Sequence, residues 1–207
     1  VLRFGEFKTK AGRLSPYFFN AGLFNTGAML SKLADFYART LIKAMEEGRI
    51  ECDMIFGPAY KGITLAAAVA MRMAELGYDL PFAYNRKEVK DHGEGGMFVG
   101  KQLADGDKVV IIEDVMTSGK ALREVLPKLK GAADVNITAM VITVDRMEKA
   151  LDSDLSAVQS ADKDFGVKVY SIVNINDIIS AIENGVIEGK QYLDAMKQYR
   201  STYGVEY

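Results

Sequence analysis

A continuous run of β-branched residues, Val109-Val110-Ile111-Ile112, places the strongest constraint on how this chain folds. A strand with one face in water alternates apolar and polar side chains, whereas an unbroken apolar run is typical of a strand buried on both faces. After this run the chain turns and enters a helical pattern over 122–129. Strand, turn and helix in this order are the unit of α/β folds. We therefore predict a three-layer sandwich with a mostly parallel central sheet.

Other segments repeat this alternation of strands and helices. A capping candidate at Asn25 or Thr26 precedes a long stretch of apolar residues at helical spacing. The expected strands cover 54–56, 81–84, 109–112, 135–144 and 167–173, and the expected helices cover 29–45, 63–76, 122–129, 176–183 and 190–200. No repeat or linker interrupts the pattern, so we expect one core domain over 28–207, preceded by a small N-terminal hood segment over 1–27.

Charge balance and the rarity of cysteine and histidine exclude several classes of protein. The 26 basic residues nearly cancel the 28 acidic ones, so no overall field attracts nucleic acid or an anionic membrane. The longest apolar stretch, 63–71, is far shorter than the roughly 20 residues that span a bilayer. The lone Cys52 and lone His92 leave no disulfide framework or zinc cluster. We expect a cytoplasmic protein without nucleic-acid or membrane partners, in which Cys52 is structural.

The turn after the Val109–Ile112 run combines two acids with small residues. Ligands of open α/β sheets bind at the carboxyl ends of strands. Backbone N–H groups at the start of the next helix, together with the hydroxyls of Thr117 and Ser118, can hold a phosphate. Glu113 and Asp114 would repel a phosphate but accept hydrogen bonds from sugar hydroxyls, so the turn suits a ribose 5-phosphate. The alternative is that these side chains only cap the strand and the helix.

This turn is not the phosphate loop of an ATP-binding protein. Gly119-Lys120 is followed by Ala121 where that loop has Ser or Thr, and Asp114 stands where its first glycine should be.

The segment 85–106 is longer than the roughly 12 to 15 residues of a passive loop. It contains several glycines, and its first half balances three Lys or Arg side chains with three carboxylates. One interpretation is a solvated loop with surface ion pairs. The other is a lid, in part a hairpin, that closes over a phosphate ester and excludes water, and this is the interpretation we favour.

The segment 109–121 resembles the phosphoribosyl pyrophosphate (PRPP) motif of the type I phosphoribosyltransferases. Further matches at 4–7, 15–22, 56–63, 85–96 and Asp145-Arg146 occur in the order found in the orotate-specific branch of that family. Glu113 stands where the family usually has aspartate, and Lys120 is bulkier than the usual residue. The resemblance also implies a first helix ahead of Val1, and the end near Tyr207 is expected of an enzyme that is not fused to a decarboxylase.

The resemblance implies the type I phosphoribosyltransferase fold and a Mg2+-dependent reaction of pyrimidine (UMP) synthesis. Ribose 5-phosphate passes from PRPP to orotate, which gives orotidine 5'-monophosphate and pyrophosphate. Mg2+ is expected to arrive with PRPP, and no residue is assigned as a metal ligand. The implied assembly is a homodimer whose active sites are shared between subunits. The alternatives are a phosphoribosyltransferase for another base and a non-enzymatic, nucleotide-sensing RNA-binding regulator with the same fold.

The resemblance also assigns roles to individual residues. The implied catalytic residues are Lys87, Lys90, His92 and Asp114. The implied PRPP-binding residues are Lys10, Tyr60, Lys61, Arg86, Lys87, Lys90, His92, Glu113, Asp114, Val115, Met116, Thr117, Ser118, Gly119, Lys120 and Ala121. The implied orotate-binding residues are Lys10, Phe18, Phe19, Thr117 and Arg146. Lys87, Lys90 and His92 are expected to reach the PRPP bound in the neighbouring subunit. From the residues alone, adjacent aromatics such as Phe18 and Phe19 more often belong to the core, and a lysine such as Lys61 is more often a solvated residue at a helix start.

Overall fold

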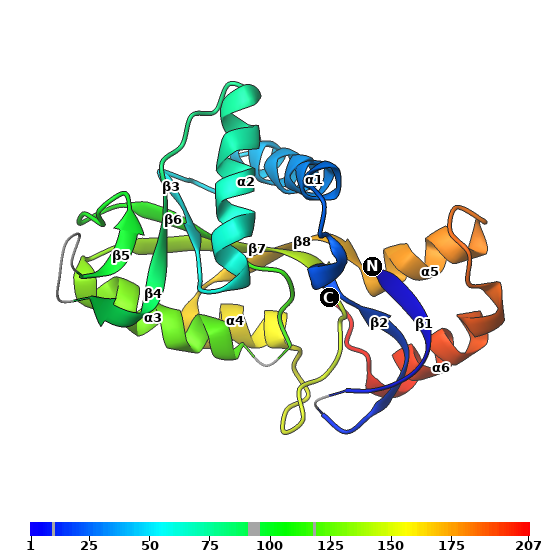
Figure 1. The fold of residues 1–207 in the computed structure, drawn as a ribbon. Coiled ribbons are helices and arrows are strands. Elements are labelled where there is room, and N and C mark those ends of the chain that lie inside the picture. Colours follow the sequence, from blue (N-terminus) through cyan, green and yellow to red (C-terminus); the bar gives the residue numbers. More distant parts are fainter. Residues whose placement is uncertain (10, 91–95, 118) are drawn as a thin grey trace.

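A six-stranded sheet forms the centre of the protein, which the computed structural model describes at residues 1–9, 11–90, 96–117 and 119–207 (Figure 1). The strands lie in the order β5-β4-β3-β6-β7-β8. Their bounds are β3 Met54–Gly57, β4 Phe82–Lys90, β5 Gly96–Gly100, β6 Lys108–Ile112, β7 Asn136–Asp145 and β8 Lys168–Asn174. Only β5 is antiparallel to its neighbour, and the other neighbouring pairs are parallel. The predicted mostly parallel sheet is confirmed.

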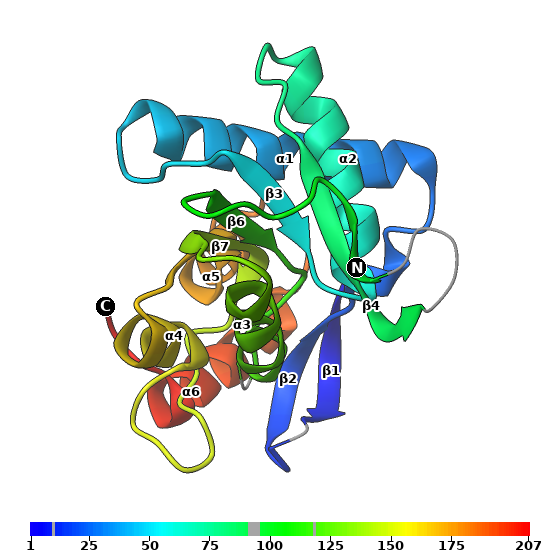
Figure 2. The same ribbon diagram turned by 90° about the vertical axis from the view of Figure 1, so that its left-hand side faces the viewer.

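Helices cover both faces of this sheet (Figure 2). They are α1 Gly27–Glu46, α2 Lys61–Glu75, α3 Lys120–Ala132 and α4 Ala157–Phe165. α1 and α2 share one core cluster with Val110, whereas α3 and α4 share another with Ile111. Successive residues of β6 therefore enter opposite clusters, which is why this strand is apolar without interruption.

The N-terminal residues form a hairpin outside the main sheet. Its strands are β1 Leu2–Lys8 and β2 Leu14–Phe19, which pair antiparallel and lead into the short 3-10 turn η1 Ala21–Leu23. The C-terminal elements are α5 Ile175–Glu183, the 3-10 turn η2 Lys190–Tyr192 and α6 Leu193–Tyr203. A third core cluster joins Tyr17 of the hairpin to Val144 at the end of β7, Ile182 of α5 and Met196 of α6. We expected the C-terminal helices only on the outside of the core, whereas they also support the hairpin.

The structure differs from the sequence-based prediction at two further places. α4 was not predicted, because only Ala157 and Ala161 of this short helix are buried and its apolar stripe is weak. β4 continues to Lys90 and pairs antiparallel with β5. These two strands form the two sides of a hairpin within the predicted lid, 85–106. Residues 91–95, between these strands, lie outside the described part of the chain. None of the described helices is both long and apolar enough to cross a membrane.

Candidate active site

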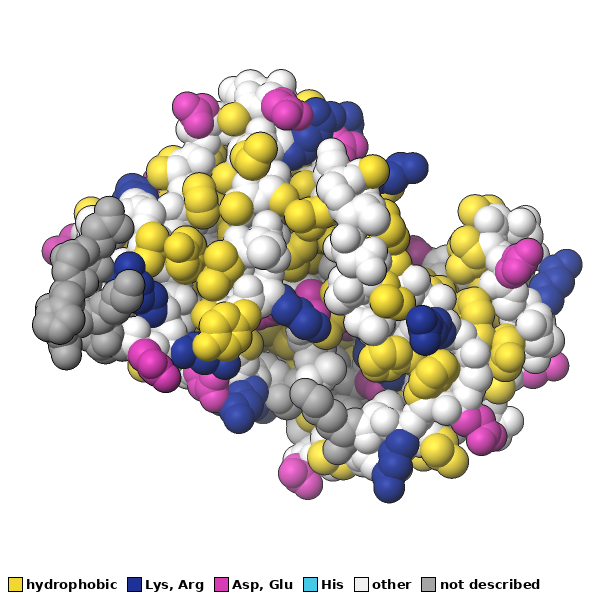
Figure 3. Space-filling view, viewed as in Figure 1, with side chains coloured by type: hydrophobic (Ala, Val, Ile, Leu, Met, Phe, Trp, Pro, Cys, Tyr) yellow, Lys and Arg dark blue, Asp and Glu magenta, His cyan; other side chains and the backbone are white. Residues whose placement is uncertain are grey.

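The candidate site lies where the strand order reverses. From β3 the chain passes through α2 to β4 on one side, and it later returns to place β6 on the other side of β3. In open α/β sheets, ligands bind at the carboxyl ends of the two strands that flank such a reversal. Figure 3 shows that the face of the molecule between α2 and the N-terminal hairpin is hollowed, with charged side chains of both signs around the hollow.

Glycine is required in the turn between β3 and α2. A Cβ on Gly57 would lie 2.1 Å from the Gly62 carbonyl oxygen, and a Cβ on Gly62 would lie 2.9 Å from the Ile112 carbonyl oxygen. These two glycines therefore allow α2 to begin in close contact with β3 and β6. This close packing brings Lys61, the first residue of α2, toward the end of β6.

Lys61 and Asp114 form an ion pair across the two strand ends. The Lys61 Nζ lies 2.6 Å from Asp114 Oδ2, while Asp114 Oδ1 accepts a hydrogen bond of 2.8 Å from the Val115 N–H. The Asp114 side chain is 9% exposed, whereas that of Lys61 is 61% exposed. The aspartate is therefore fixed by the backbone, whereas the lysine approaches it from the solvent side and can move to a ligand that supplies Asp114 with a new partner.

Glu113 is buried beside this pair. Its Oε1 accepts a hydrogen bond of 3.0 Å from the Asp114 N–H, and the residue is 8% exposed. Burial raises the pKa of Glu113 from its ordinary value of 4.5 to about 7, and the Asp114 charge adds to this rise while Lys61 opposes it. Two adjacent acids thus stand at the end of β6, both able to accept hydrogen bonds from a diol.

Tyr37 of α1 holds the backbone beneath these acids, a role that the sequence analysis missed. Its hydroxyl donates a hydrogen bond of 2.7 Å to the Glu113 carbonyl oxygen and lies 2.6 Å from Thr143 Oγ1. The Thr143 N–H donates to the Asp114 carbonyl oxygen at 2.8 Å. Burial raises the pKa of Tyr37, so the hydroxyl remains a donor. In the sequence Tyr37 is only one member of an apolar helical stripe, which gives no signal of this contact.

The turn from β6 into α3 offers backbone groups rather than side chains to a ligand. Gly119 adopts a left-handed conformation with φ 65° at the N-cap of α3, and no side chain of the described residues caps this helix end. Of the predicted PRPP-binding residues, Val115 and Met116 turn their side chains into core clusters, so only their backbone can face the hollow. Thr117 is exposed, and Ser118 lies outside the described residues. Lys120 and Ala121 begin α3, with their N–H groups in its first turn.

The base of the predicted lid contacts the β3–α2 turn. The Lys87 Nζ lies 4.7 Å from the ring centroid of Tyr60, which is 68% exposed. Asn85 Oδ1 accepts a hydrogen bond of 3.1 Å from the Ala59 N–H, a second contact that the sequence analysis missed. Arg86 Nη1 donates to the Gly96 carbonyl oxygen at 3.1 Å, within the hairpin. His92 and the side chain of Lys90 lie outside the described part of the chain.

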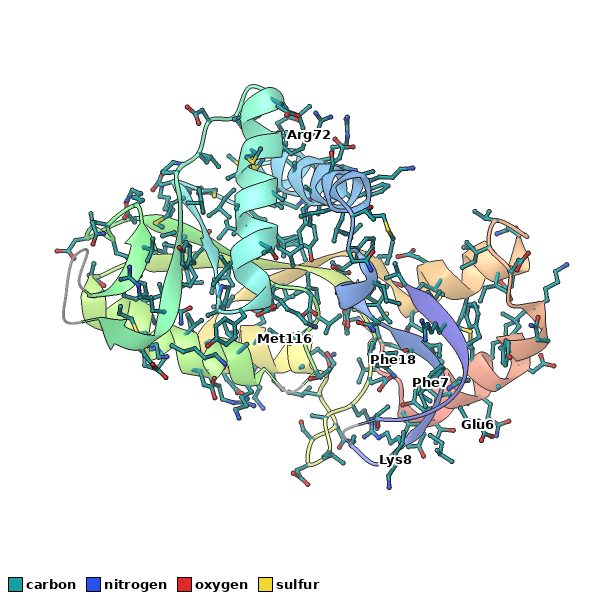
Figure 4. All side chains as sticks on the ribbon, viewed as in Figure 1. Glu6, Phe7, Lys8, Phe18, Arg72 and Met116 are labelled. Atoms are coloured by element: carbon teal, nitrogen blue, oxygen red, sulfur yellow. The ribbon has the colours of Figure 1, made fainter. Side chains whose placement is uncertain are left out.

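The predicted orotate-binding residues come from the hairpin and from the end of β7. Phe18 is 42% exposed and stacks on Phe7 with 5.5 Å between ring centroids (Figure 4). Phe19, by contrast, packs against the third core cluster, as expected for the next residue along a strand. Arg146 directly follows β7, and its Nη2 lies 2.7 Å from Glu148 Oε1. Lys10 lies outside the described residues.

The structure thus gathers the predicted residues in two groups. One group lies at the strand reversal and contains Lys61, Glu113 and Asp114, with Tyr60 and Lys87 beside them. The other group contains Phe18 of the N-terminal hairpin and Arg146, which follows β7. Within the described residues, no hydrogen bond or ion pair joins the two groups.

Known proteins resemble this chain in sequence and in structure. The phosphoribosyl transferase domain family matches residues 28–173. Orotate phosphoribosyltransferase of Herminiimonas arsenicoxydans is 51% identical over 211 residues, which cover 99% of this chain and 92% of that protein. Its counterpart in Neisseria meningitidis is 52% identical over 206 residues, which cover 100% of this chain and 92% of that protein. The crystal structure of orotate phosphoribosyltransferase of Francisella tularensis has a TM-score of 0.87 and 44% identity, and the match covers 99% of this chain and 95% of that one.

Proposed function

The chain belongs to the phosphoribosyltransferase family, in its orotate phosphoribosyltransferase branch, and from this premise we propose how its residues bind and activate the substrates. The enzyme transfers ribose 5-phosphate from PRPP to orotate in pyrimidine synthesis, which gives orotidine 5'-monophosphate and pyrophosphate. The observation that carries the proposed site is the pairing of Lys61 with Asp114 across the ends of β3 and β6.

The β6–α3 turn binds the 5-phosphate in this proposal. The N–H groups from Thr117 to Ala121 and the positive end of α3 supply the donors, and among the described residues no side chain caps this helix end. Glu113 and Asp114, at the start of the same turn, accept hydrogen bonds from the ribose hydroxyls. When the substrate binds, Lys61 moves from Asp114 to the pyrophosphate of PRPP. A ribose hydroxyl group then takes its place as the partner of Asp114.

The chemistry requires no protein nucleophile. The bond from the anomeric carbon to pyrophosphate breaks ahead of attack by the orotate ring nitrogen, and positive charge develops on the ribose. Buried carboxylates near the ribose stabilise this charge, and cations stabilise the departing pyrophosphate. We assign the cationic role to Lys61 with Arg86, Lys87, Lys90 and His92 of the lid. One such donor contributes about 2 to 4 kcal/mol if it behaves like a donor of an oxyanion hole.

The orotate ring is proposed to bind between the hood and the end of β7. Phe18 is sufficiently exposed to contact a flat ring, and Arg146 can donate to the carboxylate or carbonyl oxygens of orotate. Lys10, Phe19 and Thr117 complete the proposed pocket, and with them the hood segment 1–27 acts as a substrate-binding unit beside the core over 28–207.

Mg2+ fits this site as an ion that arrives with PRPP. Within the described residues, no group of three or more His, Cys, Asp or Glu side chains could hold a metal ion. Mg2+ is commonly bound by one or two carboxylates, water and substrate phosphates, and Glu113 and Asp114 can supply that small protein share. When bound, the ion would neutralise charge on the pyrophosphate.

We also propose a cytoplasmic homodimer that shares its active sites, with the lid of one subunit over the PRPP of the other. Hydrophobic side chains gather around α2 on the face shown in Figure 3, and Met71 of α2 and Phe36 of α1 are among the exposed large apolar residues. The free thiol of Cys52 suits a reducing compartment. The net charge of -2 favours small-molecule partners over nucleic acid.

Loss of orotate absorbance after addition of PRPP and Mg2+ tests the reaction directly. We expect turnover with orotate and none with uracil or adenine, because only orotate has a carboxylate for Arg146. An absence of turnover with orotate, or faster turnover with another base, would contradict the proposed substrate recognition. RNA binding without turnover would favour the regulator alternative.

A mixture of two inactive variants tests the shared site. Asp114→Asn disables the ribose site and Lys90→Ala disables the lid, so hybrid dimers should regain activity at one of their two sites. No recovery despite demonstrated subunit exchange would contradict the delivery of the lid across the dimer.

A further inference from the structure

Glu148 lies at the centre of a polar network behind Arg146. Its Oε1 accepts hydrogen bonds from Arg146 Nε at 2.9 Å and from the Tyr17 hydroxyl at 3.1 Å, and it lies 2.7 Å from Arg146 Nη2. Its Oε2 accepts a hydrogen bond of 3.2 Å from the Tyr199 hydroxyl. The Arg146 and Glu148 side chains are each 15% exposed, so this ion pair is more shielded from water than a surface pair.

The two hydroxyl donors come from the parts of the chain that flank the proposed orotate pocket. Tyr17 belongs to β2 of the hood, and Tyr199 belongs to α6, which supports the hood. Burial raises the pKa of both tyrosines, so their hydroxyls stay protonated and donate to the carboxylate. Glu148 therefore ties the hood and the C-terminal helix to the residue that follows β7.

The backbone between Arg146 and Glu148 is held in an unusual conformation. Met147 has a φ of 51°, in the left-handed region that side chains other than glycine seldom adopt. Its N–H donates to Asp145 Oδ1 at 2.8 Å, and its carbonyl oxygen accepts from the Val205 N–H at 2.8 Å. Such strain persists where surrounding contacts fix it and is common at functional sites.

The network leaves one nitrogen of Arg146 for a ligand. Nε and Nη2 are taken by Glu148, and Nη2 also donates to Ser15 Oγ at 3.1 Å. Nη1 has no hydrogen-bond partner among the described residues. Among the described residues, every buried side-chain nitrogen or oxygen has a hydrogen-bond partner. Since Nη1 has none, it is not fully buried. The Tyr17 ring, 4.6 Å from the guanidinium carbon, covers the flat face of the group.

We propose that Glu148 is a positioning residue for orotate recognition, which holds the guanidinium of Arg146 so that Nη1 alone points at the carboxylate or carbonyl oxygens of the base. The inference rests on the proposed orotate-binding role of Arg146. Because Glu148 holds the charged guanidinium in one orientation, Arg146 selects its ligand by the direction of its N–H groups as well as by its charge. A ligand must then place an acceptor oxygen at one position, which a carboxylate on a flat ring can do.

The test compares the KM for orotate with the KM for PRPP in the same variant. Glu148→Gln keeps the size of the side chain but weakens its hold on Arg146, so the KM for orotate should rise about tenfold or more while the KM for PRPP changes by less than about twofold. Equal rises in both KM values, or no rise in either, would overturn the positioning role. An unmutated enzyme without orotate turnover would instead refute the proposed function itself.

A double variant shows whether Glu148 acts through Arg146. If it does, adding Glu148→Gln to Arg146→Gln should cause little further loss of kcat/KM for orotate, because the group that Glu148 positions is already gone. Losses that multiply would show a merely structural role and overturn the proposal. Glu148→Asp, which keeps the charge but withdraws the carboxylate, provides the same KM comparison if Glu148→Gln does not fold. A parent-like KM for orotate in that variant would also count against the proposal.

Discussion

Replacing Glu113 with glutamine should change how the stability of the enzyme depends on pH. The pKa of Glu113 is raised from 4.5 to about 7 in the folded protein, chiefly by burial. Between these two values the folded state binds more protons than the unfolded state, so the free energy of unfolding falls as the pH rises. A shift from 4.5 to about 7 corresponds to about 3 kcal/mol at most, since each pKa unit is worth about 1.4 kcal/mol. The stabilising contribution of the protonated side chain is complete below pH 4.5 and is lost as the pH passes 7.

Urea unfolding of the parent and of Glu113→Gln at pH 5 and pH 8 measures this contribution. Glutamine retains an acceptor oxygen for the Asp114 N–H and never ionises. Relative to the parent, the variant should therefore gain about 2 to 3 kcal/mol between the two pH values. The matched control Glu188→Gln removes a carboxylate from an exposed position and should show no such gain. Parallel curves for the parent and Glu113→Gln would refute the assignment of a buried acid with a raised pKa at this position.

Three further predictions concern other parts of the molecule. Lys90→Ala should lower kcat on the order of 100-fold while orotate affinity changes little, as steady-state kinetics and equilibrium binding would show, and parent-like turnover would remove Lys90 from catalysis. Gly57→Ala should cost about 3 kcal/mol in urea unfolding or prevent folding, because its Cβ would lie 2.1 Å from the Gly62 carbonyl oxygen, and an unchanged midpoint would contradict this packing. Cys52, buried and with its pKa raised by burial to about 12, should resist iodoacetamide at pH 8 until urea unfolds the protein, and rapid labelling of the native enzyme would contradict its burial.

The sequence predicted the sheet well because its strands are buried on both faces. The β-branched run Val109–Ile112 became β6, which pairs with parallel strands on both sides. The short helix α4 lacked a comparable signal. Its capping box, Ser156 with Gln159, was present in the sequence but was not preceded or followed by a clear apolar stripe.

The candidate site was predictable only where residues adjacent in sequence share one role. Glu113, Asp114 and Gly119 follow one strand, so a single turn implied their proximity. Contacts between distant segments could not be predicted in this way. The hydrogen bond from Tyr37 to the Glu113 carbonyl oxygen joins residues 76 positions apart, and nothing in the sequence around either residue indicates it.

The Glu148 network shows the same limit for side-chain partners. The resemblance assigned Arg146 to the orotate pocket. Its partner Glu148 lies two positions later, and nothing in the sequence distinguishes it from a surface glutamate. Only the left-handed turn at Met147 and the approach of Tyr17 and Tyr199 reveal what Glu148 contacts.

A crystal structure with orotidine 5'-monophosphate bound is the most direct test of the site at the end of β6. We expect the phosphate on the backbone N–H groups between Thr117 and Ala121, with the two ribose hydroxyls on the carboxylates of Glu113 and Asp114. A nucleotide whose phosphate binds elsewhere, with this turn free of ligand, would contradict the proposed ribose 5-phosphate site.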